Sequence, residues 1–323
     1  MRAVMAFSGG MDSTGLLVHL LARGYKVSTL SYDYGQKHVI ELDRAKANIE
    51  YLATNGFDVE HRIVDLKSAM SIFHSALTNS EIEIPEGHYE EEQMKATVVP
   101  NRNAIFASIL YGYALSISTK ENIDVNIALG VHSGDHAIYP DCRPEFYDSI
   151  GESFALGNWD SERVSFNLPY IDGDKVTILR DALISCQKLG LDFDTVFANT
   201  NTSYNPDKQG RASGKSGADV ERILAFHEIG RRDPVEYVDT WDVVLSGALK
   251  AQLRHYVMKK NGTERPFTGE YDKHFESGNY HCADCDKLLF TSDSKFDSGC
   301  GWPAFSKEDE DANITQLKDT SHG

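Results

Sequence analysis

Ser8-Gly9-Gly10-Met11-Asp12-Ser13 joins two apolar segments near the start of the chain. Residues 3–7 before it read as a short buried strand, and residues 15–21 after it read as the apolar body of a helix. Two adjacent glycines let the backbone turn tightly and approach a ligand closely, and the two serines and Thr14 supply hydroxyl donors. The start of the helix adds free N–H groups and the positive end of its dipole. This pattern predicts a loop that holds triphosphate or pyrophosphate.

The loop lacks the lysine of the GxxxxGK[ST] pattern, so it does not read as a Walker-type phosphate loop. It resembles the SGGxDS loop of ATP pyrophosphatases, enzymes that split ATP between its α and β phosphates to adenylate a substrate. The resemblance implies that ATP binds along the whole loop, at Ser8, Gly9, Gly10, Met11, Asp12, Ser13 and Thr14. The alternative is a plain glycine turn that joins a strand to a helix.

Length and composition narrow the classes of function. A chain of 323 residues is long for one domain, so two domains are expected. The net charge of −17 and the lack of a basic run argue against a nucleic-acid partner and favour a small-molecule substrate. No apolar stretch reaches the ~18 residues of a membrane helix, and none resembles a signal segment. Five unevenly spaced cysteines do not suggest a disulfide framework, so we expect a protein of the reducing cytoplasm.

Strand and helix patterns alternate along the first two thirds of the chain. Residues 25–32, 59–64 and 125–131 read as strands, while residues 39–52 and 103–118 read as helices. This order predicts an α/β fold with parallel βαβ units in a Rossmann-like sheet, whose ligands gather at the carboxyl ends of the strands. The resemblance of the loop implies the adenine nucleotide alpha hydrolase-like form of this fold.

Composition changes again in the last third of the chain. Past Trp241 come Gly, Lys, Glu and Asp with scattered aromatic residues, a turn-rich pattern typical of small β domains. We therefore place a domain boundary near residue 240, between an ATP pyrophosphatase domain at residues 1–239 and a small, incomplete β-rich domain at residues 240–323. An acidic insertion at residues 80–94 reads either as a mobile flap beside the site or as a solvated loop.

Two further stretches carry groups that suit a nucleotide. Residues 31–38, Ser-Tyr-Asp-Tyr-Gly-Gln-Lys-His, end the second strand, where Lys37 or His38 could reach phosphate. In residues 99–103, Val-Pro-Asn-Arg-Asn, Arg102 is placed to face the α-phosphate as charge builds during adenylation. A helix cap is the simpler reading of one asparagine in the second stretch.

The most specific stretch is residues 139–146, Tyr-Pro-Asp-Cys-Arg-Pro-Glu-Phe. Two prolines stiffen it, and Asp141 and Arg143 place opposite charges two residues apart. The amidine edge of a purine-like base needs an acidic acceptor, and a substrate carboxylate needs a guanidinium. Asp141 and Arg143 are therefore candidate substrate-binding residues, with a surface ion pair as the alternative.

Taken together, these stretches are similar to those of the 7-cyano-7-deazaguanine synthases. The resemblance implies a carbon–nitrogen ligase of queuosine biosynthesis, which joins 7-carboxy-7-deazaguanine and ammonia at the expense of two ATP. It also implies that the SGGMDS loop holds pyrophosphate and its Mg²⁺, with Asp12, Arg102 and Lys175 as catalytic residues. Asp141 and Arg143 would then bind the deazaguanine.

One departure from that family concerns zinc. Its members hold zinc with four cysteines, and the matching positions here are Ser203, Ser213, Ser216 and Asp219. Serine hydroxyls do not ionise near neutral pH and are poor zinc ligands, so we expect no zinc there. A domain of this length can bury enough apolar surface to fold without the metal, and hydrogen bonds among the four side chains are expected to replace it locally.

The last part of the chain is similar to the opening half of the methionine-R-sulfoxide reductases. The resemblance lies in residues 261–271, 280–285 and 295–303 and continues to the last residue. In that family the catalytic cysteine and a second Cys-x-x-Cys follow later. We therefore expect no reductase activity, and either a loosely folded tail or a piece of a longer fusion. Cys282 and Cys285 read as an incomplete zinc pair or, alternatively, as a redox pair.

Other functions stay open at this point. A diverged enzyme that adenylates a deazaguanine, or a silent nucleotide-binding module that serves a partner protein, would carry the same loop. Sulfoxide reduction belongs to a third class and applies only to a longer fusion. No membrane partner is expected, and a homodimer is left open as the assembly.

Overall fold

The computed structural model describes residues 1–37, 39–78, 82, 83, 85, 86, 92–312, 314 and 315. The chain divides into two compact units, Met1–Leu249 and Lys250–Gly323. The division falls inside helix α9 (Trp241–Lys260).

The turn-rich interpretation of the sequence past Trp241 was wrong for the residues of α9, because half of them are Leu, Ala, Lys, Gln or Arg, which are good helix formers. The domain boundary near residue 240 stays a prediction.

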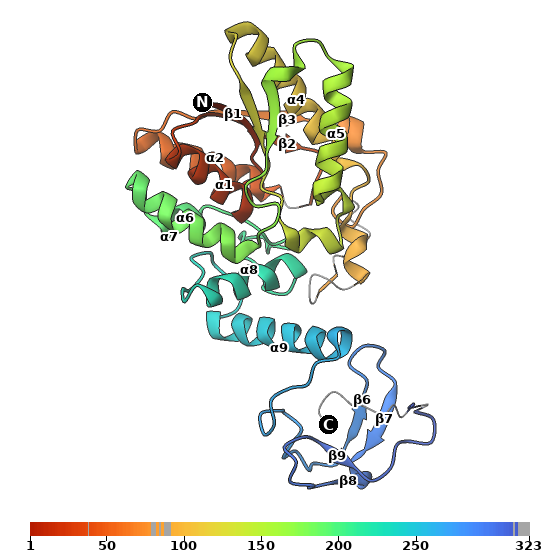
Figure 1. Ribbon diagram of the computed structural model, residues 1–323. Coiled ribbons are helices and arrows are strands. Elements are labelled where there is room, and N and C mark those ends of the chain that lie inside the picture. Colours follow the sequence, from red (N-terminus) through yellow and green to blue (C-terminus); the bar gives the residue numbers. More distant parts are fainter. Residues whose placement is uncertain (38, 79–81, 84, 87–91, 313, 316–323) are drawn as a thin grey trace. The chain divides into compact units, whose positions relative to one another are not determined.

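The first unit is built on a five-stranded sheet with the strand order β3-β2-β1-β4-β5 (Figure 1). The strands are β1 (Arg2–Ala6), β2 (Lys26–Asp33), β3 (Glu60–Asp65), β4 (Val125–Ala128) and β5 (Val164–Asn167). Every neighbouring pair of strands is parallel. The predicted α/β fold with a parallel, Rossmann-like sheet is therefore confirmed.

Helices cover both faces of this sheet (Figure 1). The described helices before α9 are α1 (Met11–Ala22), α2 (Ile40–Thr54), α3 (Lys67–Met70), α4 (Arg102–Glu121), α5 (Pro144–Gly157), α6 (Lys175–Leu189), α7 (Phe193–Ala198) and α8 (Gly217–Glu228), with short 3-10 helices at Glu92–Thr97, Ser133–Ala137, Pro140–Cys142 and Ser161–Arg163. Ala3 and Met5 of β1 belong to the apolar core shared with α1, α2, α6, α7 and α8, whereas Val4 belongs to the core shared with α4 and α5. This alternation follows from the period of two along a strand.

The order of the strands reverses between β1 and β4, which pair directly. The loops that leave their carboxyl ends therefore meet, and this is where open α/β sheets bind ligands. The backbone of Gly130, just after β4, lies so close to α1 that a Cβ there would be 3.1 Å from the Asp12 carbonyl carbon. Glycine permits this approach because it has no Cβ.

Sequence patterns predicted the first four strands and α1, α2 and α4 to within a few residues. They did not single out β5 or the helices that follow it. β5 has four residues with a mixed pattern of exposure, which is too short to show a strand period. None of the helices formed by the described residues is both long and apolar enough to cross a membrane.

The second unit contains two antiparallel pairs of short strands. They are β6 (Asn279–His281) with β7 (Leu288–Thr291), and β8 (Lys295–Phe296) with β9 (Ala304–Phe305). Phe290 stacks on Phe305 with ring centroids 4.2 Å apart, and Tyr280 meets Phe305 edge-on at 4.8 Å. The predicted small unit with strands is therefore confirmed for its described residues. The end of the predicted resemblance, residues 319–323, lies outside them.

A polar contact links α1 to α6 away from the sheet. His19 Nδ1 lies 2.6 Å from Asp181 Oδ2, and the hydroxyl of buried Tyr170 donates to the same oxygen at 2.6 Å. Burial alone would raise the pKa of Asp181, but the bonds from His19 and Tyr170 outweigh burial and lower that pKa. The contact of Asp181 with His19 and Tyr170 therefore stabilises the folded state fully at neutral pH. This stabilisation is lost as the pH falls below the ordinary pKa of an aspartate.

We expect Asp181→Ala to lower the free energy of unfolding by about 1–3 kcal/mol, because His19 and Tyr170 lose their shared acceptor. Urea denaturation at neutral pH measures the loss. The control is Asp43→Ala, which removes a carboxylate that pairs with Lys46 at the surface. A loss no larger than that of the control would contradict this account of the contact.

Candidate active site

A cavity of about 240 Å³ opens where the loops after β1 and β4 meet. Its lining combines polar and charged groups from several elements with a set of aromatic rings. Of the residues predicted from the sequence, Ser8, Gly10, Met11, Asp12, Ser13, Arg102 and Lys175 line it. Most of the predicted phosphate loop and the two cations predicted as catalytic, Arg102 and Lys175, therefore share one cavity.

The loop after β1 presents donors to this cavity. Ser8 Oγ and Ser13 Oγ lie 3.1 Å apart, and the Gly10 amide donates to Ser8 Oγ at 3.2 Å. Gly10 caps α1 with an extended backbone and no side-chain hydrogen bond, so no side chain occupies the amides of the first turn. A helix that starts in this way attracts an anion.

Gly9 provides the turn of the loop. Its φ of +85° lies in the left-handed region, and a Cβ there would be 2.1 Å from the carbonyl oxygen of Glu41 at the start of α2. Gly9 therefore packs the loop against α2 rather than lining the cavity. Thr14 does not line the cavity either, because its side chain is buried in α1.

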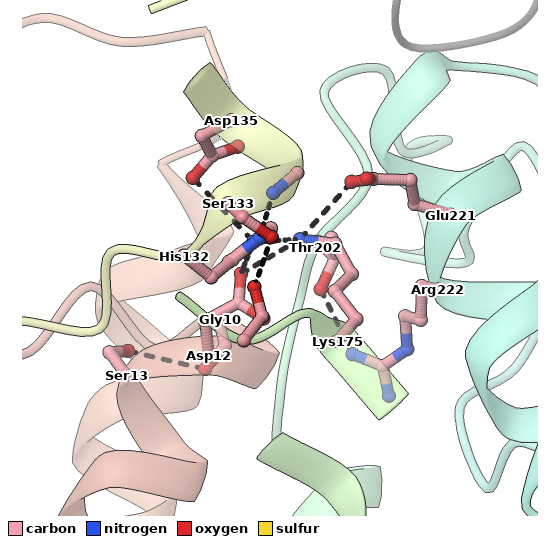
Figure 2. A network of polar contacts seen from close by, with 12 residues as sticks. Gly10, Asp12, Ser13, His132, Ser133, Asp135, Lys175, Thr202, Glu221 and Arg222 are labelled. Atoms are coloured by element: carbon pink, nitrogen blue, oxygen red, sulfur yellow. Dashed lines mark hydrogen bonds and ion pairs between the residues drawn. The ribbon is translucent and has the colours of Figure 1, made fainter. Parts of the chain in front are cut away.

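Lys175 is the centre of a charged cluster (Figure 2). Its Nζ lies 3.0 Å from Asp12 Oδ2, 3.3 Å from Glu221 Oε2 and 2.9 Å from His132 Nε2. Asp174 caps the start of α6 with its side chain, which makes Lys175 the first residue of that helix. The helix cap thus positions the lysine opposite the start of α1.

These charges stabilise one another. Burial alone would raise the pKa of Asp12, but Lys175 and His132 outweigh burial and hold that pKa below its ordinary value. Burial alone would lower the pKa of Lys175, but Asp12 and Glu221 outweigh it and raise that pKa. Asp12 and Lys175 are therefore both charged at neutral pH, and a buried cation beside a helix start suits a chain of phosphates.

Aromatic rings form another part of the lining. Tyr32 and Phe106 stack with centroids 4.0 Å apart, and burial raises the pKa of nearby Tyr34 to about 12, so that its hydroxyl stays neutral. The Arg102 guanidinium lies 5.6 Å from the ring centroid of Tyr139, and both residues line the cavity. Rings and a guanidinium together suit a flat heterocycle that carries a negative charge.

The predicted loop at residues 139–146 reaches the cavity with Tyr139 and Cys142. Asp141 does not line the cavity; its Oδ2 accepts a hydrogen bond from the Asn103 amide at 3.4 Å at the start of α4. Arg143 does not line it either, and its exposed side chain donates from Nε to the His136 carbonyl at 2.9 Å. The two predicted substrate residues thus flank the cavity-lining Cys142 in the sequence.

Several residues of the site were missed or misplaced by sequence reasoning. The sequence placed His132 and Asp135 at the carboxyl end of a predicted strand but assigned them no role, whereas Glu221 gave no signal because it lies on α8. Lys37 does not line the cavity, and its Nζ donates to the Ile82 carbonyl at 2.6 Å. His38 lies outside the described residues, as does much of the acidic insertion at 80–94.

The four positions at which zinc was not expected come together in the first unit. Ser203, Ser213 and Ser216 each donate a hydroxyl hydrogen bond to Asp219 Oδ2, at 3.0, 2.8 and 2.9 Å. The predicted hydrogen bonds among these side chains are therefore present. The hydroxyl hydrogens point at a carboxylate, which is not an arrangement of zinc ligands.

Other groups of the described residues could hold a cation. The ligand atoms of His132, Asp135 and Glu221 all lie within 4.8 Å of one another. Asp12 Oδ1 is buried and has no hydrogen-bond partner among the described residues, so it too is available to a hard cation. Asp12 and Asp135, which both line the cavity, therefore offer carboxylate oxygens that fit Mg²⁺.

Cys282 and Cys285 lie in a turn of the second unit. Hydrogen bonds from the backbone amides of Cys285 and Asp284 lower the pKa of the Cys282 thiol. The group of three metal-binding side chains found among the described residues includes neither cysteine. The incomplete zinc pair therefore stays a prediction.

Comparison with known proteins identifies both parts of the chain. Residues 2–230 match the family described as Queuosine biosynthesis protein QueC, and residues 250–323 match the SelR domain. A 7-cyano-7-deazaguanine synthase of Alteromonas mediterranea is 43% identical over 236 residues, which cover 73% of this chain and 98% of that protein. Synthases of Caldicellulosiruptor saccharolyticus and Methanoregula boonei are 42% and 40% identical and are covered over 96% and 99% of their lengths.

Proposed function

The chain belongs to the family of the queuosine biosynthesis protein QueC, and from this premise we propose that it converts 7-carboxy-7-deazaguanine and ammonia to 7-cyano-7-deazaguanine at the expense of ATP. The observation that carries the proposal is the shared cavity. The phosphate loop, Lys175 and Arg102 line it together with Tyr139 and Cys142 of the proline-bracketed loop. A nucleotide and a flat acid substrate can therefore meet in one place.

The residues at the phosphate loop would bind and orient ATP. The loop hydroxyls and the start of α1 would hold the β and γ phosphates, and Lys175 would neutralise charge on the departing pyrophosphate. Arg102 would face the α-phosphate, where negative charge grows in the transition state. Because Lys175 is already held by Asp12 and Glu221, it needs no rearrangement to act.

The proposed reaction uses two adenylations. A carboxylate oxygen of the substrate attacks the α-phosphorus of ATP, the bond to pyrophosphate breaks, and an acyl adenylate forms. Ammonia attacks the acyl carbon as the free amine, AMP leaves, and the amide forms with loss of a proton. The amide oxygen then attacks a second ATP in the same way, and loss of AMP and the two N–H protons gives the nitrile. Positioning and charge stabilisation are the main contributions of the protein.

Mg²⁺ would be held beside the loop by Asp12, whose Oδ1 is buried and has no hydrogen-bond partner among the described residues. When bound, it supplies positive charge to the phosphates. The dipole of α1 and the Lys175 ammonium supply charge of the same sign from the protein itself. Asp12 would therefore both bind the Mg²⁺ ion and orient Lys175.

The proposal is tested by incubating the protein with ATP, Mg²⁺, ammonia and 7-carboxy-7-deazaguanine, and by following AMP and the nitrile with mass spectrometry. We expect both products, in a ratio of two AMP to one nitrile. AMP without nitrile would contradict the proposal and favour a different deazaguanine-adenylating enzyme. Neither product would favour a silent nucleotide-binding module.

Asp141 and Arg143 are proposed to bind the deazaguanine, because they lie on either side of the cavity-lining Cys142. We expect Arg143→Ala to raise the KM for 7-carboxy-7-deazaguanine by about 10-fold, since a charged hydrogen bond to the carboxylate is lost, while ATP binding is retained. The control is Arg180→Ala, an exposed arginine that pairs with Glu228 on the surface. Equal KM values in the two variants would contradict a role for Arg143 in substrate binding.

The homodimer, the cytoplasmic location and the absence of zinc in the first unit stay predictions. The match of residues 250–323 to the SelR domain identifies the second unit by similarity.

A further inference from the structure

Residues 200–204 form one wall of the cavity and touch the phosphate loop directly. Asn201, Thr202 and Tyr204 line the cavity. The Asn201 amide donates to the Gly9 carbonyl at 3.0 Å. Because this backbone bond joins the wall to the turn of the loop, a displacement of the wall moves the loop as well.

Arg222 of α8 contacts this wall and is buried, with only 1% of the Arg222 surface exposed. Its guanidinium donates to Thr200 Oγ1 at 2.7 Å and to Thr202 Oγ1 at 3.0 Å (Figure 2). Two further bonds to Asp233, at 2.6 and 2.8 Å, fix the plane of the guanidinium. The wall is thus anchored to α8 at its first and third residues.

Asp219 gives the wall a second anchor, about one helical turn before Arg222. It is 1% exposed, and its Oδ2 accepts the three serine hydroxyls described above and also the Ser216 amide at 3.2 Å. One of those hydroxyls belongs to Ser203, which lies in the wall itself and is fully buried. Four donors on one carboxylate oxygen hold the wall and the segment before α8 in fixed relative positions.

The family resemblance implies a zinc ion at these positions, and the residues present do not fit it. Zinc prefers thiolates and imidazoles, and serine is a poor ligand because its hydroxyl does not ionise near neutral pH. Here each hydroxyl donates its hydrogen to Asp219 Oδ2, so the three serine oxygens act as donors to a carboxylate, while Asp219 Oδ1 is buried without a hydrogen-bond partner among the described residues.

We propose that Asp219 is a positioning residue, which holds the cavity wall and through it the phosphate loop without a metal ion. The link runs from Asp219 to Ser203, from the Ser203 carbonyl to the Asn201 side chain at 2.9 Å, and from the Asn201 amide to Gly9. The effect on ATP rests on the proposed function, whereas the link itself can be measured without turnover.

Hydrogen exchange followed by mass spectrometry tests the link in the full chain. We expect Asp219→Asn to speed amide exchange in residues 8–14 as well as in residues 197–204, because the anchor of the wall is weakened. The control is Asp207→Asn, which removes a carboxylate that accepts bonds from Arg211 in the loop after the wall. Unchanged exchange in residues 8–14 of Asp219→Asn would overturn the proposal.

Kinetics supply a second readout. We expect Asp219→Asn to raise the KM for ATP by about 10-fold or more, with a smaller effect on kcat. The reason is that the substitution displaces the phosphate loop but leaves all of its side chains in place. Asp207→Asn should leave the KM for ATP unchanged. If Asp219→Asn does not fold, Ser213→Ala removes a single hydroxyl from Asp219 and should shift exchange and KM in the same direction by less. A KM equal to that of the parent chain in the folded variant would overturn the positioning role.

Metal analysis tests whether Asp219 holds the cavity wall without zinc. In a chain with Cys282→Ser and Cys285→Ser, we expect no stoichiometric zinc and no change in Tm on treatment with a zinc chelator. One zinc per chain, or a drop in Tm on chelation, would overturn the metal-free proposal. If the parent chain makes no AMP at all, the proposed function fails, while the exchange and metal measurements still decide the role of Asp219.

Discussion

Gly9→Ala is expected to lower AMP formation by about 100-fold or more, while the protein stays folded. The new Cβ would lie 2.1 Å from the Glu41 carbonyl oxygen and 2.9 Å from the Ala45 amide nitrogen, both backbone atoms of α2. Neither atom can move without moving the helix, so the loop must shift instead. A shift of the loop displaces the hydroxyls and amides that are proposed to hold the β and γ phosphates.

The matched control is Gly24→Ala. Gly24 has a similar φ of +77°, but a Cβ there would meet no atom within 4 Å. Both substitutions therefore carry the cost of a left-handed alanine, about 1–2 kcal/mol, and only Gly9→Ala adds the clash. Rates of AMP release and Tm values of the two variants separate the effects. Equal rates of AMP release would show that the packing of Gly9 against α2 does not matter for the site.

Asp12→Asn is expected to lower the rate of AMP formation by about 100- to 1,000-fold, with little change in the circular dichroism spectrum. Asp12 holds Lys175 through its Oδ2 and keeps a buried Oδ1 for a cation. An amide in its place carries no charge and is a weak ligand for Mg²⁺. We therefore expect the phosphates to be less well organised and Lys175 to be less well oriented.

Asp194→Asn is the control for this prediction. Asp194 is the second residue of α7, as Asp12 is of α1, and it also pairs with a cation, Arg231, at 2.7 Å. It is exposed and lies outside the cavity lining. The two variants therefore lose the same charge at the same position of a helix. AMP formation that falls equally in both, or in neither, would contradict the role of Asp12.

Local patterns were sufficient for much of the architecture. An apolar run of five residues, two glycines and a second apolar segment predicted β1, the phosphate loop and α1, because each depends on neighbours in the sequence. The alternation of later strands and helices predicted a parallel sheet, and parallel strands deliver their following loops to one edge. That reasoning placed Asp12 and Arg102 at one site, whereas Lys175 was implied only by the resemblance to the synthase family.

Local patterns failed where long-range contacts or weak periodicity decided the outcome. α9 was taken for a turn-rich segment because its glycine and charged residues obscured a long run of good helix formers. Asp141 and Arg143 were predicted to bind the substrate, and this role stays a proposal, because the residues of their loop that line the cavity are Tyr139 and Cys142. A stiff loop fixes the spacing of its residues and not the direction in which each side chain points.

By itself, the sequence determined which local segments form the sheet, where the loops leave it, and which chemical groups those loops carry. Only the tertiary structure decided which groups meet: Lys175 contacts Asp12 across 163 positions of the chain, and Glu221 joins them from a helix that follows later. It also decided that the three serines share a single oxygen of Asp219, Oδ2. The physical reason is that a charge or a hydroxyl has no partner until the strands are ordered and the helices are packed, and that order is set by burial of apolar surface over the whole unit.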